Sequence, residues 1–198
     1  MESVRDEEYR GYMIRIQVDE DPIDPRKEFD NLGHMVCWHQ HYNLGDEQPG
    51  ADPHEWAKHN LKDEDVFYEP LYLYDHSGIT MGIHDFNDRW DSGQVGWIYV
   101  KKEDVRKEWG VKRISPKLRH TVYANLMAEV KTYDAYISGE VYGWEIFDPE
   151  DEGKDGVWGY YGYDEMDYMI TEAKAAVDGE IVRVEKEKQE QHEWDCRE

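Results

Sequence analysis

The sequence QVGWIYV at residues 94–100 is the strongest strand signal in the chain, because β-branched and aromatic residues dominate it. A short helix is predicted directly after it, over residues 102–109, with Gly110 as its stop. The clearest helix follows, with Ser115 as its cap and Pro116 in its first turn. Its apolar face recurs at spacings of three and four residues: Leu118, Val122, Leu126, Val130, Tyr133 and Ile137. The fold therefore combines strands with amphipathic helices.

Similar patterns extend outward in both directions. Residues 12–18 alternate between apolar and polar side chains, as a half-buried strand does. Asp52 and Pro53 indicate the start of a capped helix that ends near Leu61. Further strands are predicted at residues 34–42, at 66–74 with an edge or a bulge at Pro70, at 79–83, and as a hairpin of 140–147 with 156–161.

Near the end of the sequence, Asp164 is predicted to cap a last amphipathic helix with Met166, Met169, Ile170, Ala173 and Val177 on its apolar face. Residues 181–184 add a strand or a helical extension, and residues 185–198 form a charged, flexible tail. The strands and helices follow no strict βαβ order. We therefore expect an α+β fold over residues 1–184, a single domain with a largely antiparallel sheet and three to four helices packed on it.

The charge of the chain is strongly acidic, with 46 acidic against 23 basic residues in a length of 198. Concentrated salt would screen the resulting repulsion, as in a halophilic host. A partner with a basic surface is the other explanation, and it includes a nucleic-acid-binding enzyme that is blocked by imitation of phosphates. The acids are spread along the chain, which favours salt adaptation. Direct binding of nucleic acid is not expected, because no basic stripe is visible.

The sequence also indicates the compartment. Two cysteines, Cys37 and Cys196, are too few for a disulfide framework, so a reducing compartment is expected. No apolar run approaches 18 residues, and the first ten residues lack the apolar core of a secretory signal. We therefore predict a location in the cytoplasm of a host cell, with no contact to a membrane.

One stretch of sequence carries a resemblance. The string LYLYDHSGITMGIHDFNDRWDSGQVGWIYV at residues 71–100, with WHQHYNLGD at 38–46, resembles an uncharacterised family of proteins encoded by phages, proviruses and archaeal viruses. The order of GEVYGWEIF and GVWGYYG is also similar, so the resemblance covers most of residues 32–177. The chain departs from the family at residues 85–89, DFNDR, where a cysteine-bearing stretch is expected. The resemblance implies an accessory role for a mobile element and no particular chemistry.

The histidine-rich segment is the first candidate site. On a strand, Cys37, His39 and His41 share a face, while His34 points elsewhere. Thiolate and imidazole are good zinc ligands, and three of them leave room for water. The alternative is a half-exposed strand with ordinary histidines, since no second Cys/His pair with standard spacing is visible. Zinc is the one cofactor that the sequence allows; otherwise none is expected.

The second candidate site follows from the predicted pairing of the strands before and after the loop 84–92. That pairing would gather several catalytic candidates: Asp75, His76, His84, Asp85, Asp88, Arg89 and Asp91. A histidine oriented by a carboxylate can act as a general base, and Arg89 can hold an anionic group. Asp, Asn, Ser and Gly also build tight turns, so a purely structural turn network is the competing interpretation.

Aromatic residues form a third group, namely Trp90, Trp97, Trp144, Trp158, Tyr160 and Tyr161, and we expect each of them in the core rather than on a binding surface. No phosphate-binding glycine loop, dinucleotide fingerprint or HExxH string occurs. The favoured hypothesis is a non-enzymatic viral or proviral protein that contacts a host or viral protein, with a DNA-imitating anti-defence inhibitor as its sharper form. The alternative is a small hydrolase or metal-assisted enzyme centred on residues 75–92, and a virion component is a third possibility.

Overall fold

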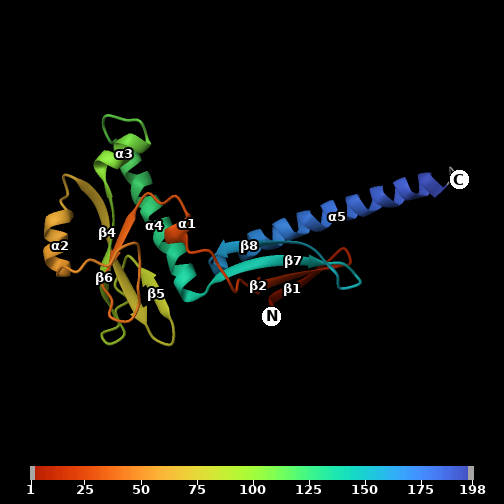
Figure 1. Ribbon diagram of the computed structural model, residues 1–198, viewed down its shortest axis with the longest axis horizontal. Coiled ribbons are helices and arrows are strands. Elements are labelled where there is room, and N and C mark those ends of the chain that lie inside the picture. Colours follow the sequence, from red (N-terminus) through yellow and green to blue (C-terminus); the bar gives the residue numbers. More distant parts are fainter. Residues whose placement is uncertain (1–2, 196–198) are drawn as a thin grey trace. The chain divides into compact units, whose positions relative to one another are not determined.

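The chain folds as two compact units. The computed structural model describes residues 3–195 (Figure 1). Unit 1 contains the residues up to Pro22 and those from Gly139 onward, and unit 2 contains Ile23–Ser138. One domain was predicted over residues 1–184, whereas the chain forms two units, each with its own hydrophobic cluster. The physical reason is that the strands on either side of unit 2 pair with each other.

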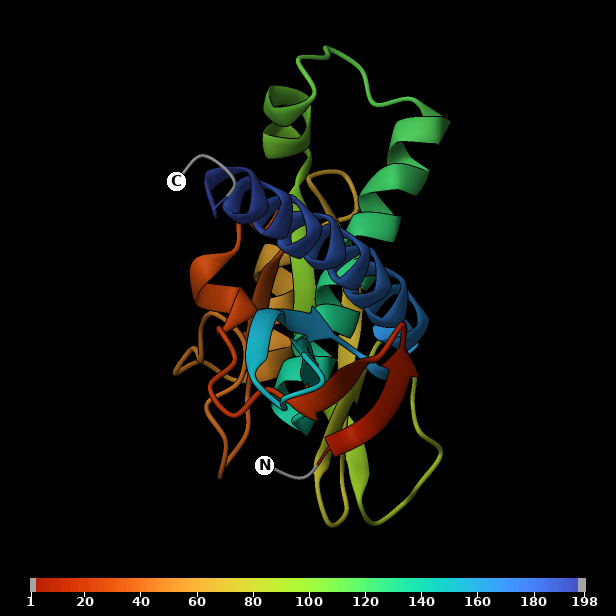
Figure 2. The same ribbon diagram turned by 90° about the vertical axis from the view of Figure 1, so that its right-hand side faces the viewer.

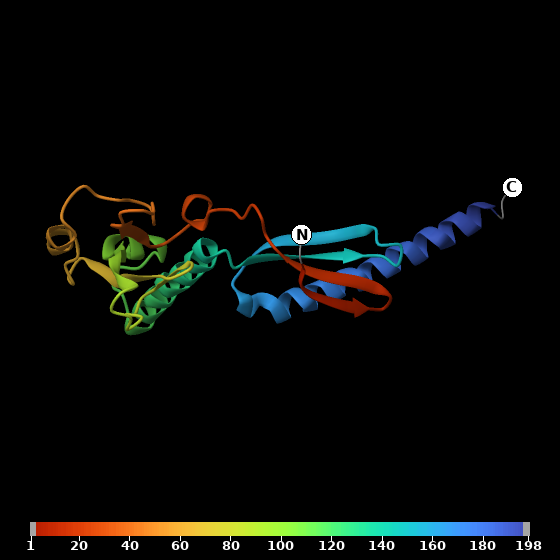
Figure 3. The ribbon, with the colours of Figure 1, turned by 90° about the horizontal axis from the view of Figure 1, so that it is seen from below.

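Unit 1 is a four-stranded antiparallel sheet with one long helix. The strand order is β1 (Ser3–Tyr9), β2 (Tyr12–Val18), β7 (Val141–Phe147) and β8 (Gly153–Tyr161). A 3-10 turn, η1 (Tyr163–Glu165), leads into helix α5 (Met166–Asp195), whose first part lies along one face of the sheet (Figure 2, Figure 3). The core contains Ile14, Ile16, Tyr142, Trp144 and Ile146 from the sheet, and Met166, Met169, Ile170, Ala173 and Val177 from α5.

Two boundaries in unit 1 differ from the sequence prediction. Asp164 lies inside η1, so the helix begins one residue later than a cap at Asp164 implies. Helix α5 then continues through residues 181–184 and into the segment that was predicted as a charged tail, up to Asp195. The side chains of residues 185–194 are exposed, and residues 196–198 lie outside the described range. Ion pairs of Arg183 with Glu180 and Glu187 link successive turns there.

Unit 2 has the second antiparallel sheet. Its strand order is β3 (His34–Cys37), β6 (Ser92–Lys101), β4 (Val66–Asp75) and β5 (Ile79–Gly82). Its helices are α1 (Pro25–Glu28), α2 (Pro53–Asn60), α3 (Lys102–Glu108) and α4 (Pro116–Ser138). The bulge expected near Pro70 occurs as a register shift between Leu71 and Tyr72. Strand β3 ends at Cys37, five residues before the predicted end.

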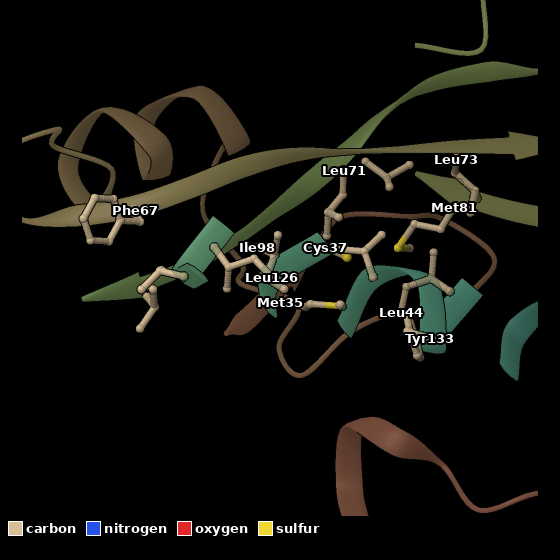
Figure 4. Close-up of a cluster of buried hydrophobic side chains, with 14 of the residues drawn as sticks. Met35, Cys37, Leu44, Phe67, Leu71, Leu73, Met81, Ile98, Leu126 and Tyr133 are labelled. Atoms are coloured by element: carbon tan, nitrogen blue, oxygen red, sulfur yellow. The ribbon is translucent and has the colours of Figure 1, made fainter. Parts of the chain in front are cut away.

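Helix α4 closes the core of unit 2. Its predicted face is confirmed at Val122, Leu126, Val130 and Tyr133, all of which are buried. They pack with side chains from the sheet, including Met35, Leu71, Leu73 and Ile98 (Figure 4). Burial of one such aliphatic side chain contributes about 1.5–3 kcal/mol, so this contact dominates the stability of the unit.

The α+β class is confirmed. Both sheets are antiparallel, and the range 3–195 contains five α-helices, against three to four predicted around a single sheet. The additional helix, α1, has only four residues and too short a pattern to be recognised in the sequence. Among the residues that the structure describes, no helix is both long enough and apolar enough to cross a membrane.

Candidate functional site

At one end of the sheet in unit 2, the last residues of β3 and β4 lie close to the first half of β6. Strands β3 and β4 both run antiparallel to β6. Cys37 at the end of β3 pairs with Gly96, and Tyr74 near the end of β4 pairs with Ser92. A cavity of about 800 Å³ lies at this end of the sheet, and we call it the strand-end cavity. Its lining consists of Trp38, His39, Gln40, His41, Gln48, Leu73, Asp75, Trp90, Asp91, Ser92, Gly93, Gln94 and Val95.

The strand-end cavity joins parts of two candidate sites that the sequence kept separate. It brings His39 and His41 from the loop after β3 together with Asp75 and Asp91. The other predicted catalytic residues are outside its lining: His76, His84, Asp85, Asp88 and Arg89. The sequence missed Trp38, Gln48 and Gln94. Gln94 begins the predicted strand 94–100, whereas Trp38 lay within the predicted strand 34–42 and Gln48 in the loop after it.

His76 and Asp91 form the one predicted His–carboxylate pair that the structure brings together. The Nδ1 atom of His76 lies 2.8 Å from Oδ2 of Asp91. The backbone N–H of Asp75 donates to the carbonyl of Asp91 over 2.8 Å, which fixes the backbone around this pair. Both side chains are open to water, with 62% of His76 and 37% of Asp91 exposed. Solvent therefore weakens the electrostatic influence of the pair.

The loop 84–92 is held by hydrogen bonds of its own side chains. Asp88 accepts from the backbone N–H groups of Asp91, at 2.9 Å, and Trp90, at 2.8 Å. These two bonds hold the pKa of Asp88 below its usual range. Asp85 accepts from the N–H of Asn87, which has a positive φ of 58°. This is the structural turn network that the sequence offered as the competing interpretation.

The serines near the His76–Asp91 pair are poorly placed as nucleophiles. The Ser92 hydroxyl lies 2.5 Å from the carbonyl oxygen of Asp88, to which it donates its proton. Ser77 is exposed and lies in the turn between β4 and β5, where it has a φ of 59°. A base accelerates attack by a hydroxyl only if it accepts the proton of that hydroxyl. Among the described residues, neither serine hydroxyl is therefore hydrogen-bonded to the His76–Asp91 pair.

The proposed ligand set Cys37, His39 and His41 does not converge. Cys37 is buried in the core, and burial raises the pKa of its thiol to about 12, so the thiol stays protonated. His39 and His41 follow the end of β3, where the alternation of strand faces no longer applies. The Nδ1 atom of His39 accepts from the N–H groups of His41 and Tyr42. Across residues 3–195, no three His, Cys, Asp or Glu side chains are grouped to hold a metal ion.

The aromatic residues divide between core and surface. Trp144 is buried, as predicted, and its indole N–H donates to the hydroxyl of Tyr160 over 2.9 Å. Trp97 is half-buried and packs against Trp38 with a ring separation of 5.7 Å. Trp90 is 88% exposed beside the strand-end cavity, and Trp158 is 39% exposed. Trp90 therefore belongs to the surface and not to the core.

An ion-pair network that the sequence did not indicate lies elsewhere in unit 2. The guanidinium of Arg26, only 3% exposed, donates to Asp46 at 2.8 and 2.6 Å and to Glu129 at 2.8 Å. Glu129 also accepts from the N–H groups of Leu32 and Gly33. The network connects α1, the loop after β3 and α4 by charges whose partners are far apart in sequence. Its contacts are all internal, so its role is structural.

The fold and the site define a class of protein in chemical terms: an α+β protein of two units, one of which has an open cavity with aromatic, amide and carboxylate groups. No family model, no curated protein and no solved structure matches the chain.

Proposed function

We propose that this protein is a virus- or provirus-encoded accessory protein that binds a protein partner inside the host cell and catalyses no reaction. The observation that carries the proposal is the strand-end cavity with Trp90, 88% exposed, beside it. A large, rigid aromatic side chain that is open to water at a cavity is typical of a residue that anchors a partner.

The chemistry of the strand-end cavity indicates the kind of partner. Its indole rings, Trp38 and Trp90, attract cations to their faces. Its carboxylates, Asp75 and Asp91, attract the same cations, and the amide of Gln94 offers hydrogen bonds. The net charge of −23 draws positively charged partners toward the protein. We therefore expect the partner to present a segment with exposed lysine or arginine.

A peptide-display selection tests the proposal. Random peptides are selected on the immobilised protein, and the binders are measured against Trp90→Ala and Asp91→Asn. We expect enrichment of Lys- and Arg-containing peptides whose affinity falls at least tenfold with either variant. Trp194→Ala is the matched control, because Trp194 is also exposed, at 64%, but lies on α5. Peptides that bind all variants equally, or no enrichment at all, would contradict the proposal.

The His76–Asp91 pair supports a second candidate, a small hydrolase centred on residues 75–92. A carboxylate within 2.8 Å orients the histidine ring, as a general base requires. A panel of ester, amide and phosphoester substrates tests this candidate with the wild type and His76→Asn. Turnover that disappears in His76→Asn would establish it, and no turnover above the His76→Asn background would end it.

Imitation of DNA is the sharper form of the binding proposal, and the distribution of charge bears on it. Unit 1 has 26 acidic and 9 basic residues, whereas unit 2 has 20 and 14. The excess of acid is therefore largely a property of unit 1. An anti-defence inhibitor of this kind would release its partner when duplex DNA is added. Its partner would still bind Trp90→Ala, because that residue lies in unit 2.

A further inference from the structure

Basic residues concentrate in one segment of unit 2. Residues 101–119 hold eight of the 23 lysines and arginines, and only three acidic residues. Acidic residues outnumber basic ones twofold in the whole chain, so this segment reverses the prevailing sign. The total charge had concealed it, and a count over a sliding window would have shown it. The segment forms α3, the following loop and the start of α4 (Figure 2).

Five of these cations line one pocket of about 540 Å³, which we call the basic pocket. Its lining consists of Phe67, Lys102, Arg106, Lys112, Arg113, Ile114, Ser115, Pro116 and Arg119, and it includes no Asp or Glu. The contributions come from β4, α3, the loop and the first turn of α4. Because three separate elements supply the cations, the fold itself gathers the charge at this place.

The five cations lack carboxylate partners. Among the described residues, none of them has a carboxylate within ion-pair distance, although the described chain contains many ion pairs. Lys102 donates to the backbone carbonyl of Asp63, and its ammonium lies 4.9 Å from the centre of the Phe67 ring. Arg119 lies 5.7 Å from the same ring. Gathering like charges is unfavourable unless an anion offsets their repulsion.

The start of α4 adds to the positive potential. Ser115 caps the helix by accepting from the N–H of Leu118 at 3.1 Å, and Pro116 occupies the first helical position. The positive end of the dipole of this 23-residue helix therefore lies at the basic pocket. The N-terminus of a helix together with lysine and arginine side chains is a favourable environment for phosphate oxygens.

We propose that the basic pocket binds a compact, multiply charged phosphate ligand, such as a polyphosphate group. Compactness follows from two observations. The cations converge on one pocket and do not form a track, and the overall charge of −23 repels an extended polyanion such as a nucleic acid strand. Phe67 is 4% exposed and lies against Lys102 and Arg119, so the pocket offers phosphate contacts and no face on which a base stacks.

Calorimetric titration with inorganic tripolyphosphate at low salt tests the proposal. We expect saturable binding that weakens as salt rises. In the double variant Arg106→Gln/Arg113→Gln, the affinity should fall at least tenfold. The double variant Lys58→Gln/Lys188→Gln removes the same charge from exposed positions outside the basic pocket and should bind as the wild type does. Without ligand, the basic-pocket variant should be as thermally stable as the wild type or more so, because its repulsion is reduced.

Two comparisons complete the experiment. ATP should bind about as well as tripolyphosphate if the phosphates alone are recognised. A single-stranded oligonucleotide that binds more tightly than tripolyphosphate, with the same loss in Arg106→Gln/Arg113→Gln, would replace the compact ligand by nucleic acid and overturn the proposal. Equal affinity in the two double variants, or no saturable binding at millimolar tripolyphosphate, would also overturn it.

Discussion

At the scale of single residues, buried charge in unit 2 is the most sensitive feature. Arg26 is 3% exposed and is surrounded by acceptors from Asp46, Glu129 and the carbonyl of Gly33. Removal of Arg26 leaves two largely buried carboxylates without the cation that balances their charge, which costs far more than the pair itself contributes. Exposed pairs such as Arg183 with Glu187 contribute little, because water screens them.

We therefore expect Arg26→Ala to lower the free energy of unfolding of unit 2 by about 3–5 kcal/mol. Urea denaturation monitored by circular dichroism measures this change. Arg183→Ala is the control, and its unfolding midpoint should remain close to that of the wild type. A midpoint for Arg26→Ala that also stays close to the wild type would show that the buried network is not needed.

His34 makes the stability depend on pH. Its Nδ1 lies 3.3 Å from Asp46 and its Nε2 lies 3.3 Å from Glu47, and these carboxylates raise the pKa of His34. Burial alone would raise the pKa of Asp46, but hydrogen bonds from His34 and Arg26 outweigh it and hold that pKa well below its usual range. The contribution of His34 is complete below about pH 6.5 and disappears as the pH rises through its higher folded-state pKa.

His34→Gln should accordingly remove part of the loss of stability that occurs as the pH rises above about 6.5. The contribution of Asp46 has the opposite sign: it is present above about pH 3.9 and disappears as the pH falls. Because His34 is one of the donors that lower the pKa of Asp46, the acid side of the profile should become shallower in His34→Gln, and Arg26 should preserve part of it. Urea midpoints measured from below about pH 3.9 to well above about pH 6.5 cover both sides, and profiles of identical shape for the two proteins would refute the assignment to His34.

At the scale of elements, periodic segments could be predicted and unpatterned ones could not. The apolar face of α4 and the alternation in β2 identify those elements directly. Strand β1, SVRDEEY, went unrecognised because its side chains are mostly charged, and pairing with the backbone of β2 holds it in place. The prediction of the zinc site failed for a related reason. Face alternation placed Cys37 and His39 together, and it failed because β3 ends at Cys37.

The pairing of β3 with β6 depends on the absence of a side chain at Gly96. A Cβ atom there would lie 2.0 Å from the carbonyl oxygen of Val36, whereas a Cβ at Gly93 would meet nothing within 4 Å. Gly96→Ala should therefore destabilise unit 2 by about 1–3 kcal/mol, and Gly93→Ala on the same strand should have little effect. Thermal unfolding of both variants measures the difference. Equal midpoints would mean that β3 moves aside freely.

At the scale of the whole molecule, the sequence predicts the α+β class of the fold but not its division into two units. Hydrophobic patterns reveal strands but not their partners, so nothing in the sequence distinguished one sheet from two. The same limit hid the strand-end cavity, because His41 and Asp75 are far apart in sequence and meet only through the pairing of β3, β6 and β4.

Salt adaptation, which we propose as the reason for the acid excess, makes a prediction for the molecule as a whole. The thermal midpoint should rise steeply between dilute buffer and molar potassium chloride, because the screening length shrinks to about 3 Å at 1 M. The effect should be larger for unit 1, whose 26 acidic residues face only 9 basic ones. Calorimetry over a salt series measures it, and a flat response would rule the explanation out.

The insertion of unit 2 between β2 and β7 also determines when the strands of unit 1 can pair during synthesis. The hairpin of β1 and β2 is translated before unit 2, but β7, the other neighbour of β2, follows only after the 116 residues of unit 2. At about 5–20 residues per second the delay is about 6–23 seconds. An isolated hairpin is marginally stable, so Ile14 and Ile16 stay uncovered on the ribosome while unit 2 condenses. Strands β1 and β2 thus precede unit 2 in synthesis but reach their native environment after it.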